Sequence, residues 1–262
     1  MIVRDEPDGS MIMIGQSDHS KLSGVLAAHW GNEQFERPRP YESCVRAAML
    51  HDCGWFRYEA NPRFDEKLGR TPNFMHVALD REQLDAFQWG TDWLTDIDPY
   101  SGLLINKHRT GLWRGRYGSV SHPVAFNVTN PAETLNQFIL ANEARQKQEE
   151  PKVNSEEFRI NYQLLQVWDF LSLFVCVREP QVDYIEPVPL GYSNGKGVRM
   201  DFKPAGGGKI VLDPYPFDVP SLPVGLVHRH LATNKFPDKA SFQQAYYQAP
   251  LQLLQFEFVR PT

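Results

Sequence analysis

The chain has 262 residues, of which 27 are Lys or Arg and 32 are Asp or Glu, so its formal net charge is −5 at pH 7. Hydrophobic residues make up 42% and charged residues 23%, an ordinary composition that excludes a disordered chain, a collagen-like chain and a small disulfide-bonded scaffold. A mildly acidic chain lacks the basic surface that neutralises phosphates, so we expect no nucleic-acid polymer as a partner.

The first half of the chain predicts a β-hairpin followed by helices. Residues 2–15 hold two apolar runs around Glu6-Pro7-Asp8-Gly9-Ser10, a sequence typical of a turn. The spacing of apolar residues then favours helices over residues 20–30, 41–52, about 84–93 and 103–113. Residues 59–78 are rich in Pro, Arg and Asn, which indicates a loop between the second and third of these helices.

The second half of the chain begins with helices and ends in short strands. A helix is expected to open at Asn130-Pro131, and another to run from residue 156 to about residue 177. Beyond residue 178, Pro and Gly recur at short intervals. Strand-like segments lie between them at residues 182–185, 198–202, 209–212, 222–228 and 251–259. Residues 242–247 predict a short helix.

These patterns together predict an α+β fold that is mainly α. Residues 17–178 would form a helical core, residues 1–16 a hairpin, and residues 179–262 a β-rich region with a small sheet. Because an isolated hairpin is only marginally stable in water, we expect the N-terminal hairpin to join the C-terminal strands. The hairpin would then tie both ends of the chain into one unit.

The sequence also bears on the cellular compartment. The chain starts with acidic residues where a signal peptide would carry positive charge followed by an apolar run. The most membrane-like stretch, residues 160–177, contains Asp169 and several amides, so we expect a buried helix and no membrane partner. The cysteines Cys44, Cys53 and Cys176 form no CxxC pair, which favours structural thiols in a reducing cytoplasm.

Asp169 is the most informative position in the sequence. The apolar residues from Leu164 to Val175 cover every face of the predicted helix around it, so this helix is expected to be buried at the centre of the fold. An unpaired carboxylate in such a place would cost several kcal/mol. Asp169 therefore needs a cation, a metal ion or strong hydrogen-bond donors. A structural salt bridge or a helix cap is the simpler alternative to a functional role.

A histidine and a His-Asp pair lie at the ends of two earlier helices. His19 is at the start of the first helix, and His51-Asp52 ends the second. Imidazoles and carboxylates suit borderline divalent metals. With Asp169 they would leave open positions on the metal for water and substrate, and the metal would lower the pKa of that water. We therefore predict a divalent ion, Zn, Fe, Mn or Mg, as the cofactor.

This order, a histidine, then a His-Asp pair, then a distant aspartate, resembles the HD-domain superfamily of metal-dependent phosphohydrolases over residues 17–178. Longer blocks at residues 16–24, 48–55 and 168–173 resemble an uncharacterised bacterial family placed near that superfamily, over nearly the whole chain. The superfamily resemblance implies an HD-like helical bundle around a metal and hydrolysis of phosphomonoesters, phosphodiesters or nucleotides. It also implies that the metal ligands are His19, His51, Asp52 and Asp169.

The segment from residue 106 to residue 118 is the predicted substrate-binding region, because it gathers basic residues. Guanidinium groups pair bidentately with phosphate, and an ammonium adds a point charge. The predicted substrate-binding residues are Lys107, Arg109, Arg114 and Arg116; a solvated helix face is the alternative. His108 would be a general acid, a phosphate donor or a ligand of a second metal, and we predict it and Asp52 as the catalytic residues.

Three functions remain open on the sequence. The leading hypothesis is a divalent-metal-dependent hydrolase acting on a small phosphorylated compound or nucleotide. The second is an HD-type di-iron oxygenase, for which His76 and His108 are the candidate additional ligands. The third is a non-catalytic ligand-binding or structural protein in which these residues form a polar core. Elsewhere, His228 and His230 fall on one face of a predicted strand, which is expected to be exposed.

Overall fold

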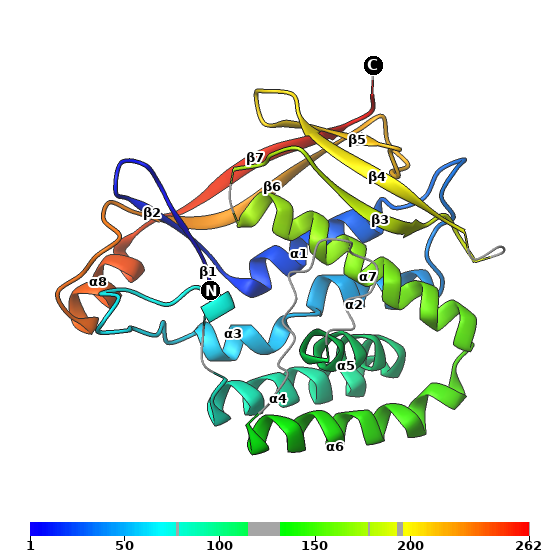
Figure 1. Cartoon of the computed structure of the whole chain (residues 1–262), viewed down its shortest axis with the longest axis horizontal. Helices are drawn as coiled ribbons and strands as arrows, with labels where there is room; N and C mark the ends of the chain where they lie inside the picture. Colours follow the sequence, from blue (N-terminus) through cyan, green and yellow to red (C-terminus); the bar gives the residue numbers. More distant parts are fainter. Residues whose placement is uncertain (77–78, 115–131, 178, 193–195, 262) are drawn as a thin grey trace.

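A computed structural model describes residues 1–76, 79–114, 132–177, 179–192 and 196–261 (Figure 1). The strands are β1 (Ile2–Asp5), β2 (Met11–Ile14), β3 (Asp183–Pro189), β4 (Gly197–Pro204), β5 (Lys209–Asp213), β6 (Ser221–Leu231) and β7 (Leu251–Val259). The α-helices are α1 (Gln16–Ala28), α2 (Tyr41–Leu50), α3 (Cys53–Glu59), α4 (Arg81–Ile97), α5 (Pro99–Trp113), α6 (Glu133–Glu149), α7 (Ser155–Cys176) and α8 (Lys239–Gln248). Two short 3₁₀ turns are η1 (Phe74–His76) and η2 (Glu150–Lys152).

The strands that the structure describes form one seven-stranded sheet with the order β1-β2-β6-β7-β5-β4-β3. Neighbouring strands are antiparallel except β5 and β7, which are parallel. The hairpin of β1 and β2 extends the sheet, because Met11, Ile12 and Met13 pair with Leu231, His230 and Arg229 of β6. Segments from the two ends of the chain therefore lie side by side in one curled layer (Figure 1).

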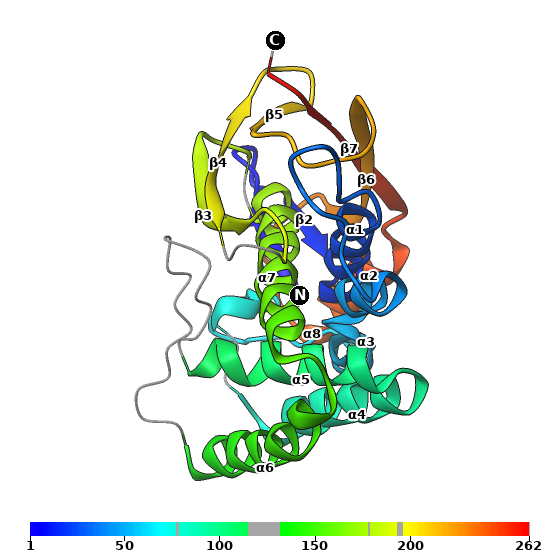
Figure 2. The ribbon, with the colours of Figure 1, turned by 90° about the vertical axis from the view of Figure 1, so that its right-hand side faces the viewer.

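This fold corrects the predicted one. The mainly α, HD-like bundle with a small sheet is wrong, because the seven-stranded sheet spans one whole side of the helices (Figure 2). β6 alone runs from Ser221 to Leu231, whereas the sequence predicted a strand over residues 222–228. Pro223 and Gly225 lie inside β6, and both residue types weaken strands. The local sequence pattern therefore predicts a strand that is too short, because pairing with β2 and β7 stabilises the full length of β6.

The main core lies between the concave face of the sheet and the helices α1 and α7 (Figures 1 and 2). Alternate residues of β6 point into it, because side chains of a strand alternate between its two faces. The buried β6 residues of this core are Leu222, Val224 and Leu226. At the hairpin end α8 covers the other face, where Phe242 packs with Met11 and Met13.

The central helix α7 is as buried as its sequence predicts. Asn154 caps its first turn by accepting hydrogen bonds from the backbone N–H groups of Glu156 and Glu157. Asp169 is 4% exposed among apolar neighbours that are nearly all buried. None of the helices in the described part of the chain has the length and apolar character needed to cross a bilayer. The Asp169 carboxylate is thus held inside the protein, where it requires partners.

Asp98 fixes the start of α5, the helix that leads toward this carboxylate. Its Oδ1 accepts hydrogen bonds from the backbone N–H groups of Tyr100 and Ser101, at 3.0 and 3.3 Å. Its Oδ2 accepts one from the Ser101 hydroxyl at 2.7 Å and pairs with Arg46. Burial raises the pKa of Asp98, but the bonds from Ser101 and Arg46 lower it below its usual range.

Asp98→Ala is expected to lower the free energy of unfolding by about 1–2 kcal/mol at pH 7, because the helix loses its N-terminal cap. The folded pKa lies below the unfolded value of 3.8. The contribution of Asp98 is therefore complete above the unfolded pKa and declines as the pH falls toward the folded pKa. Urea unfolding of both proteins at pH 7 and at about pH 3.5 measures the difference. An equal loss at the two pH values would contradict this account.

Candidate metal centre

Four helices bring the predicted metal ligands to one place. His19 lies in the first turns of α1, His51 follows α2, Asp52 precedes α3, and Asp169 lies in α7. Their exposed fractions are 1%, 3%, 5% and 4%. Residues far apart in the sequence thus form a single buried polar cluster. Their role as metal ligands stays a prediction. The distances between their donor atoms can be compared with those around a metal ion.

The donor atoms are spaced as neighbours in a metal coordination shell would be. Atoms of His19, His51 and Asp169 all lie within 4.8 Å of one another. His51 Nε2 is 3.2 Å from Asp169 Oδ1 and 3.8 Å from Asp52 Oδ2. His19 Nε2 is 3.0 Å from Asp52 Oδ2. Ligands about 2.0–2.2 Å from one ion lie roughly 3.0–3.4 Å from each other, so the separations of 3.0 and 3.2 Å fit a divalent ion, whereas that of 3.8 Å would have to shorten on binding.

His51 turns one ring nitrogen toward the cluster. Its Nδ1 lies 2.8 Å from the carbonyl oxygen of Ala48, which only accepts, so Nδ1 carries the hydrogen and donates it. In the neutral ring Nε2 then has a lone pair. Within the described residues this buried Nε2 has no hydrogen-bond partner of acceptable geometry. A buried imidazole lone pair beside two carboxylates suits a metal ion.

The carboxylates of the cluster are held in their ionised form. Burial raises the pKa of Asp52, but the charges of Arg109 and His51 lower it well below its usual range. Burial likewise raises the pKa of Asp169, but His51 and His108 lower it below its usual range. Against the effect of burial, the same carboxylates raise the pKa of His51. The cluster therefore offers two ionised carboxylates as ligands, and a divalent cation would balance the charge that Arg109 leaves.

His108 lies beside His51 and faces the other oxygen of the Asp169 carboxylate. Its Nε2 is 3.5 Å from Asp169 Oδ2, and its ring centroid is 5.2 Å from that of His51. Burial lowers the pKa of His108 to about 3, despite the Asp169 carboxylate, so the imidazole is neutral at pH 7. A neutral imidazole can bind a metal or accept a proton, whereas a general acid needs the protonated ring. The catalytic roles of His108 and Asp52 stay predictions.

Arg109 is the predicted substrate residue that the structure brings to the cluster. Its guanidinium group forms an ion pair with Asp52 Oδ1 and lies 4.2 Å from the centre of the Phe87 ring. Its side chain is 11% exposed. A small cavity of about 10 Å³, the size of one water, lies beside it and is lined by residues that include His51, Cys53 and Thr91. Arg109 therefore lies at the edge of the cluster, in contact with Asp52 and with the small cavity.

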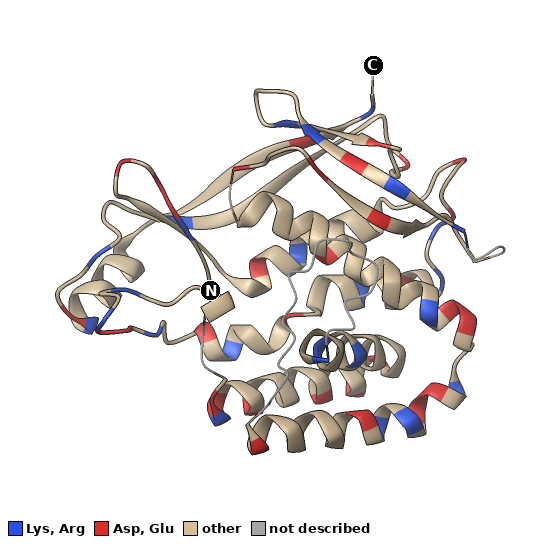
Figure 3. Cartoon of the chain, in the orientation of Figure 1, with Lys and Arg blue, Asp and Glu red and all other residues tan. Residues whose placement is uncertain are grey.

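The other predicted substrate residues have partners elsewhere. Lys107 pairs with Glu150 of η2, and Arg114 pairs with Glu143 of α6. Arg116 lies outside the described residues. Figure 3 shows the basic residues of α5 close to acidic residues of the neighbouring helices. The structure thus does not place Lys107 or Arg114 beside Arg109, and a shared phosphate-binding role for them stays a prediction.

Three residues beside the cluster were missed in the sequence. Ser23 and Ser172 are fully buried between α1 and α7 next to His19. Gly24 allows α1 to approach α2, because a Cβ there would lie 2.5 Å from Cβ of Met49. A signal was present, since Ser23 follows His19 by four residues and Ser172 follows Asp169 by three. Side chains at those spacings share a helix face, which predicts support of a ligand by a hydroxyl.

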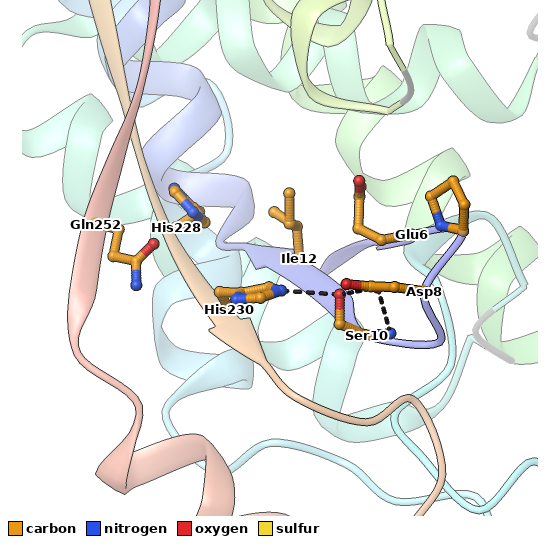
Figure 4. A pocket seen from close by; sticks show the side chains of 8 residues that line it. Glu6, Asp8, Ser10, Ile12, His228, His230 and Gln252 are labelled. Carbon is orange, nitrogen blue, oxygen red and sulfur yellow. Dashed lines mark hydrogen bonds between the residues drawn. The ribbon is translucent and has the colours of Figure 1, made fainter.

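A second group of polar side chains surrounds a hollow of about 400 Å³ on the sheet, lined by residues of the hairpin turn, β6 and β7 (Figure 4). His230 Nε2 lies 2.8 Å from Ser10 Oγ, which donates to Asp8 Oδ1 at 2.6 Å. His228 is 6% exposed, so the expectation that both histidines are exposed is wrong for His228. The end of β6 is thus partly covered by its neighbours.

His76, a candidate additional ligand of the oxygenase hypothesis, lies in η1 and is exposed.

Comparison with known proteins reaches the level of the family. A family model described as "Protein of unknown function (DUF3891)" matches residues 1–233. No curated protein and no solved structure gives a significant match. The resemblance of the sequence to an uncharacterised family is therefore confirmed at the level of the family. None of these comparisons links the chain to the HD-domain superfamily.

Proposed function

The chain belongs to the DUF3891 family of proteins of unknown function, and we propose that it is a divalent-metal-dependent hydrolase of small phosphoric esters. The observation that carries the proposal is the buried set of donor atoms from His19, His51 and Asp169, all within 4.8 Å of one another. Asp52 adds an oxygen 3.0 Å from His19 Nε2. Imidazoles together with carboxylates suit Zn, Fe or Mn better than Mg, which prefers oxygen ligands.

In this proposal the ion supplies Lewis acidity, which activates water and offsets charge on the ester oxygens. The chain supplies the rest. His19, His51, Asp52 and Asp169 would hold the ion, and burial keeps bulk water from weakening their charges. Arg109, at the edge of the cluster, carries a planar guanidinium suited to a phosphate group. The order of the four ligands, which resembles that of HD-domain phosphohydrolases, supports phosphoric esters as the substrate class.

The decisive experiment measures metal content and esterase activity on the same sample. Protein purified without chelator is analysed for Zn, Fe, Mn and Mg and then tested on phosphatase, phosphodiesterase and nucleotidase substrates. We expect about one ion per chain and turnover of at least one ester, with both lost in His51→Ala. A fully loaded protein that turns over no ester in the panel would instead support a non-catalytic role.

One observation favours a second candidate function, an oxygenase with two iron ions. His108 Nε2 is 3.5 Å from Asp169 Oδ2, whereas His51 faces Oδ1 of the same carboxylate. Asp169 therefore has one oxygen for each of two sites, and His108 would serve the second. Iron at about two ions per chain, with a visible absorption band and no phosphate release, would favour this function. Zinc or manganese with phosphate release would exclude it.

Arg109→Ala is expected to raise KM for a phosphorylated substrate by about 10–100-fold, since a charge-assisted hydrogen bond contributes about 1.5–3 kcal/mol. The matched control is Arg145→Ala, which removes an arginine that pairs with Asp92 away from the cluster. Steady-state kinetics of the two variants and the wild type measure the effect. An unchanged KM in Arg109→Ala would indicate that Arg109 pairs only with Asp52 and does not bind the substrate.

A further inference from the structure

We propose that Ser172 is a positioning residue of the metal centre, whose hydroxyl holds His19 with a hydrogen on Nδ1 and with Nε2 toward the other ligands. This inference rests on the proposed function, because it assigns the residue that orients one of the proposed ligands. Ser172 lies in α7 one turn after Asp169, and His19 lies in α1. One turn of α7 would thus provide both a ligand and the support of another ligand.

The hydrogen bonds around Ser172 form a short chain. His19 Nδ1 lies 2.8 Å from Ser172 Oγ, and Ser172 Oγ donates to the carbonyl oxygen of Asp169 at 2.8 Å. Ser23 Oγ donates to Ser172 Oγ at 2.9 Å. A hydroxyl has one hydrogen to donate and two lone pairs to accept. With its hydrogen given to the carbonyl, Ser172 accepts from both Ser23 and His19, so His19 Nδ1 is the donor.

The other nitrogen of His19, Nε2, faces the cluster, where a bound ion would take the place of its hydrogen bond to Asp52. His19 Nε2 is 3.0 Å from Asp52 Oδ2, and Asp52 in turn lies beside His51. This matches His51, whose Nδ1 hydrogen is donated to the Ala48 carbonyl. The two histidines of the centre are therefore oriented by the same device, an acceptor behind Nδ1. For His51 the acceptor is backbone, and for His19 it is a side chain that a mutation can remove.

Burial makes the Ser172 hydroxyl hard to replace. Ser23 and Ser172 are each 0% exposed and His19 is 1% exposed. When the hydroxyl is removed, the Nδ1 hydrogen of His19 is left without an acceptor in a place that bulk water does not reach. The ring is then free to exchange its tautomer or to rotate. Hydrogen-bond partners behind a metal-bound histidine typically change metal affinity by about 10–100-fold when they are mutated.

The test uses Zn²⁺ as the probe and Ser172→Ala as the variant, in the full chain. Competition with a chromophoric chelator gives the Kd for Zn²⁺, which we expect to rise by about 10–100-fold. The control is Ser101→Ala, another fully buried serine, whose hydroxyl lies 2.8 Å from the Ser43 carbonyl oxygen and 2.7 Å from Asp98 Oδ2, neither of which belongs to the cluster. It is expected to lose stability without any change in the Kd. Equal Kd values for folded Ser172→Ala and wild type would overturn the proposal.

A second measurement separates this inference from the proposed function. Nitrogen-15 NMR of histidine-labelled protein reports which ring nitrogen of His19 carries the hydrogen, and it needs no metal. We expect Nδ1 to carry a hydrogen in the metal-free wild type, and this hydrogen to be partly lost in Ser172→Ala. If the wild type binds no Zn²⁺, the proposed function fails, and the tautomer alone decides the role of Ser172. A wild-type His19 with no hydrogen on Nδ1 would overturn that role.

Discussion

Asp169→Asn is expected to abolish stoichiometric metal binding while leaving the helices folded. Asp169 is 4% exposed, and its Oδ1 lies 3.2 Å from His51 Nε2. The amide has nearly the same shape but no negative charge, so a divalent ion would lose the ligand that faces both His51 and His108. Removing one partner of a buried charge pair costs about 3–5 kcal/mol, which corresponds to a loss of affinity of at least about 100-fold.

Elemental analysis of variant and wild type, purified side by side without chelator, measures this loss. Thermal unfolding gives an independent reading, because an ion that binds only the folded state raises its melting temperature. Added Zn²⁺ or Mn²⁺ is expected to raise the melting temperature of the wild type and not that of Asp169→Asn. Asp92→Asn, which alters an aspartate of α4 paired with Arg145, is the control. Near-stoichiometric metal in Asp169→Asn would remove the basis of the proposed site.

The cluster could be predicted because its signals are local. The apolar residues on every face of α7 identify Asp169 as buried, and a buried carboxylate requires a cation, a metal ion or strong hydrogen-bond donors. His19 and His51 were then found at the ends of two other predicted helices. These residues come together if their helices pack against one another, and α1, α2 and α7 do so. No knowledge of the sheet was required for this step.

The sheet was underestimated because its pairing is not local. β6 joins β2, more than two hundred residues earlier, to β7, and β5 lies parallel to β7. Short apolar runs separated by Pro and Gly predict strands, but they do not show which strands pair or how far pairing extends a strand. The hairpin was placed correctly with the C-terminal strands by a stability argument, whereas the size of the sheet was not.

The basic segment of α5 failed as a cluster for a geometric reason. Lys107 and Arg109 are two residues apart, and side chains at that spacing point about 200° apart around a helix. Arg109 therefore faces Asp52 while Lys107 faces Glu150. Closeness in the sequence therefore does not bring these basic side chains together in space. Helical geometry separates Lys107 from Arg109 but does not say which of them lies near Asp52, since both are next to His108 in the sequence.

Gly24→Ala is expected to destabilise the protein and to weaken the metal centre at the same time. A Cβ at position 24 would lie 2.5 Å from Cβ and 2.8 Å from Cα of Met49, so α1 and α2 would have to move apart. Alanine favours a helix over glycine by about 1 kcal/mol, but overpacking against a backbone costs about 1–3 kcal/mol or more. Because the clash involves Cα of Met49, no rotamer change relieves it. We therefore expect the cost of overpacking to exceed the gain in helix propensity.

The separation of the two helices also moves His19, five residues before Gly24, away from His51, two residues after Met49. Urea unfolding and Zn²⁺ titration of the same variant measure the two effects, and we expect both stability and affinity to fall. Gly225→Ala in β6 is the control, because its Cβ would meet Leu253 Cδ2 at an ordinary 3.4 Å. Since α1 holds His19 and α2 leads into His51, a Gly24→Ala protein that loses stability but keeps normal Zn²⁺ affinity would mean that this helix contact does not set the geometry of the centre.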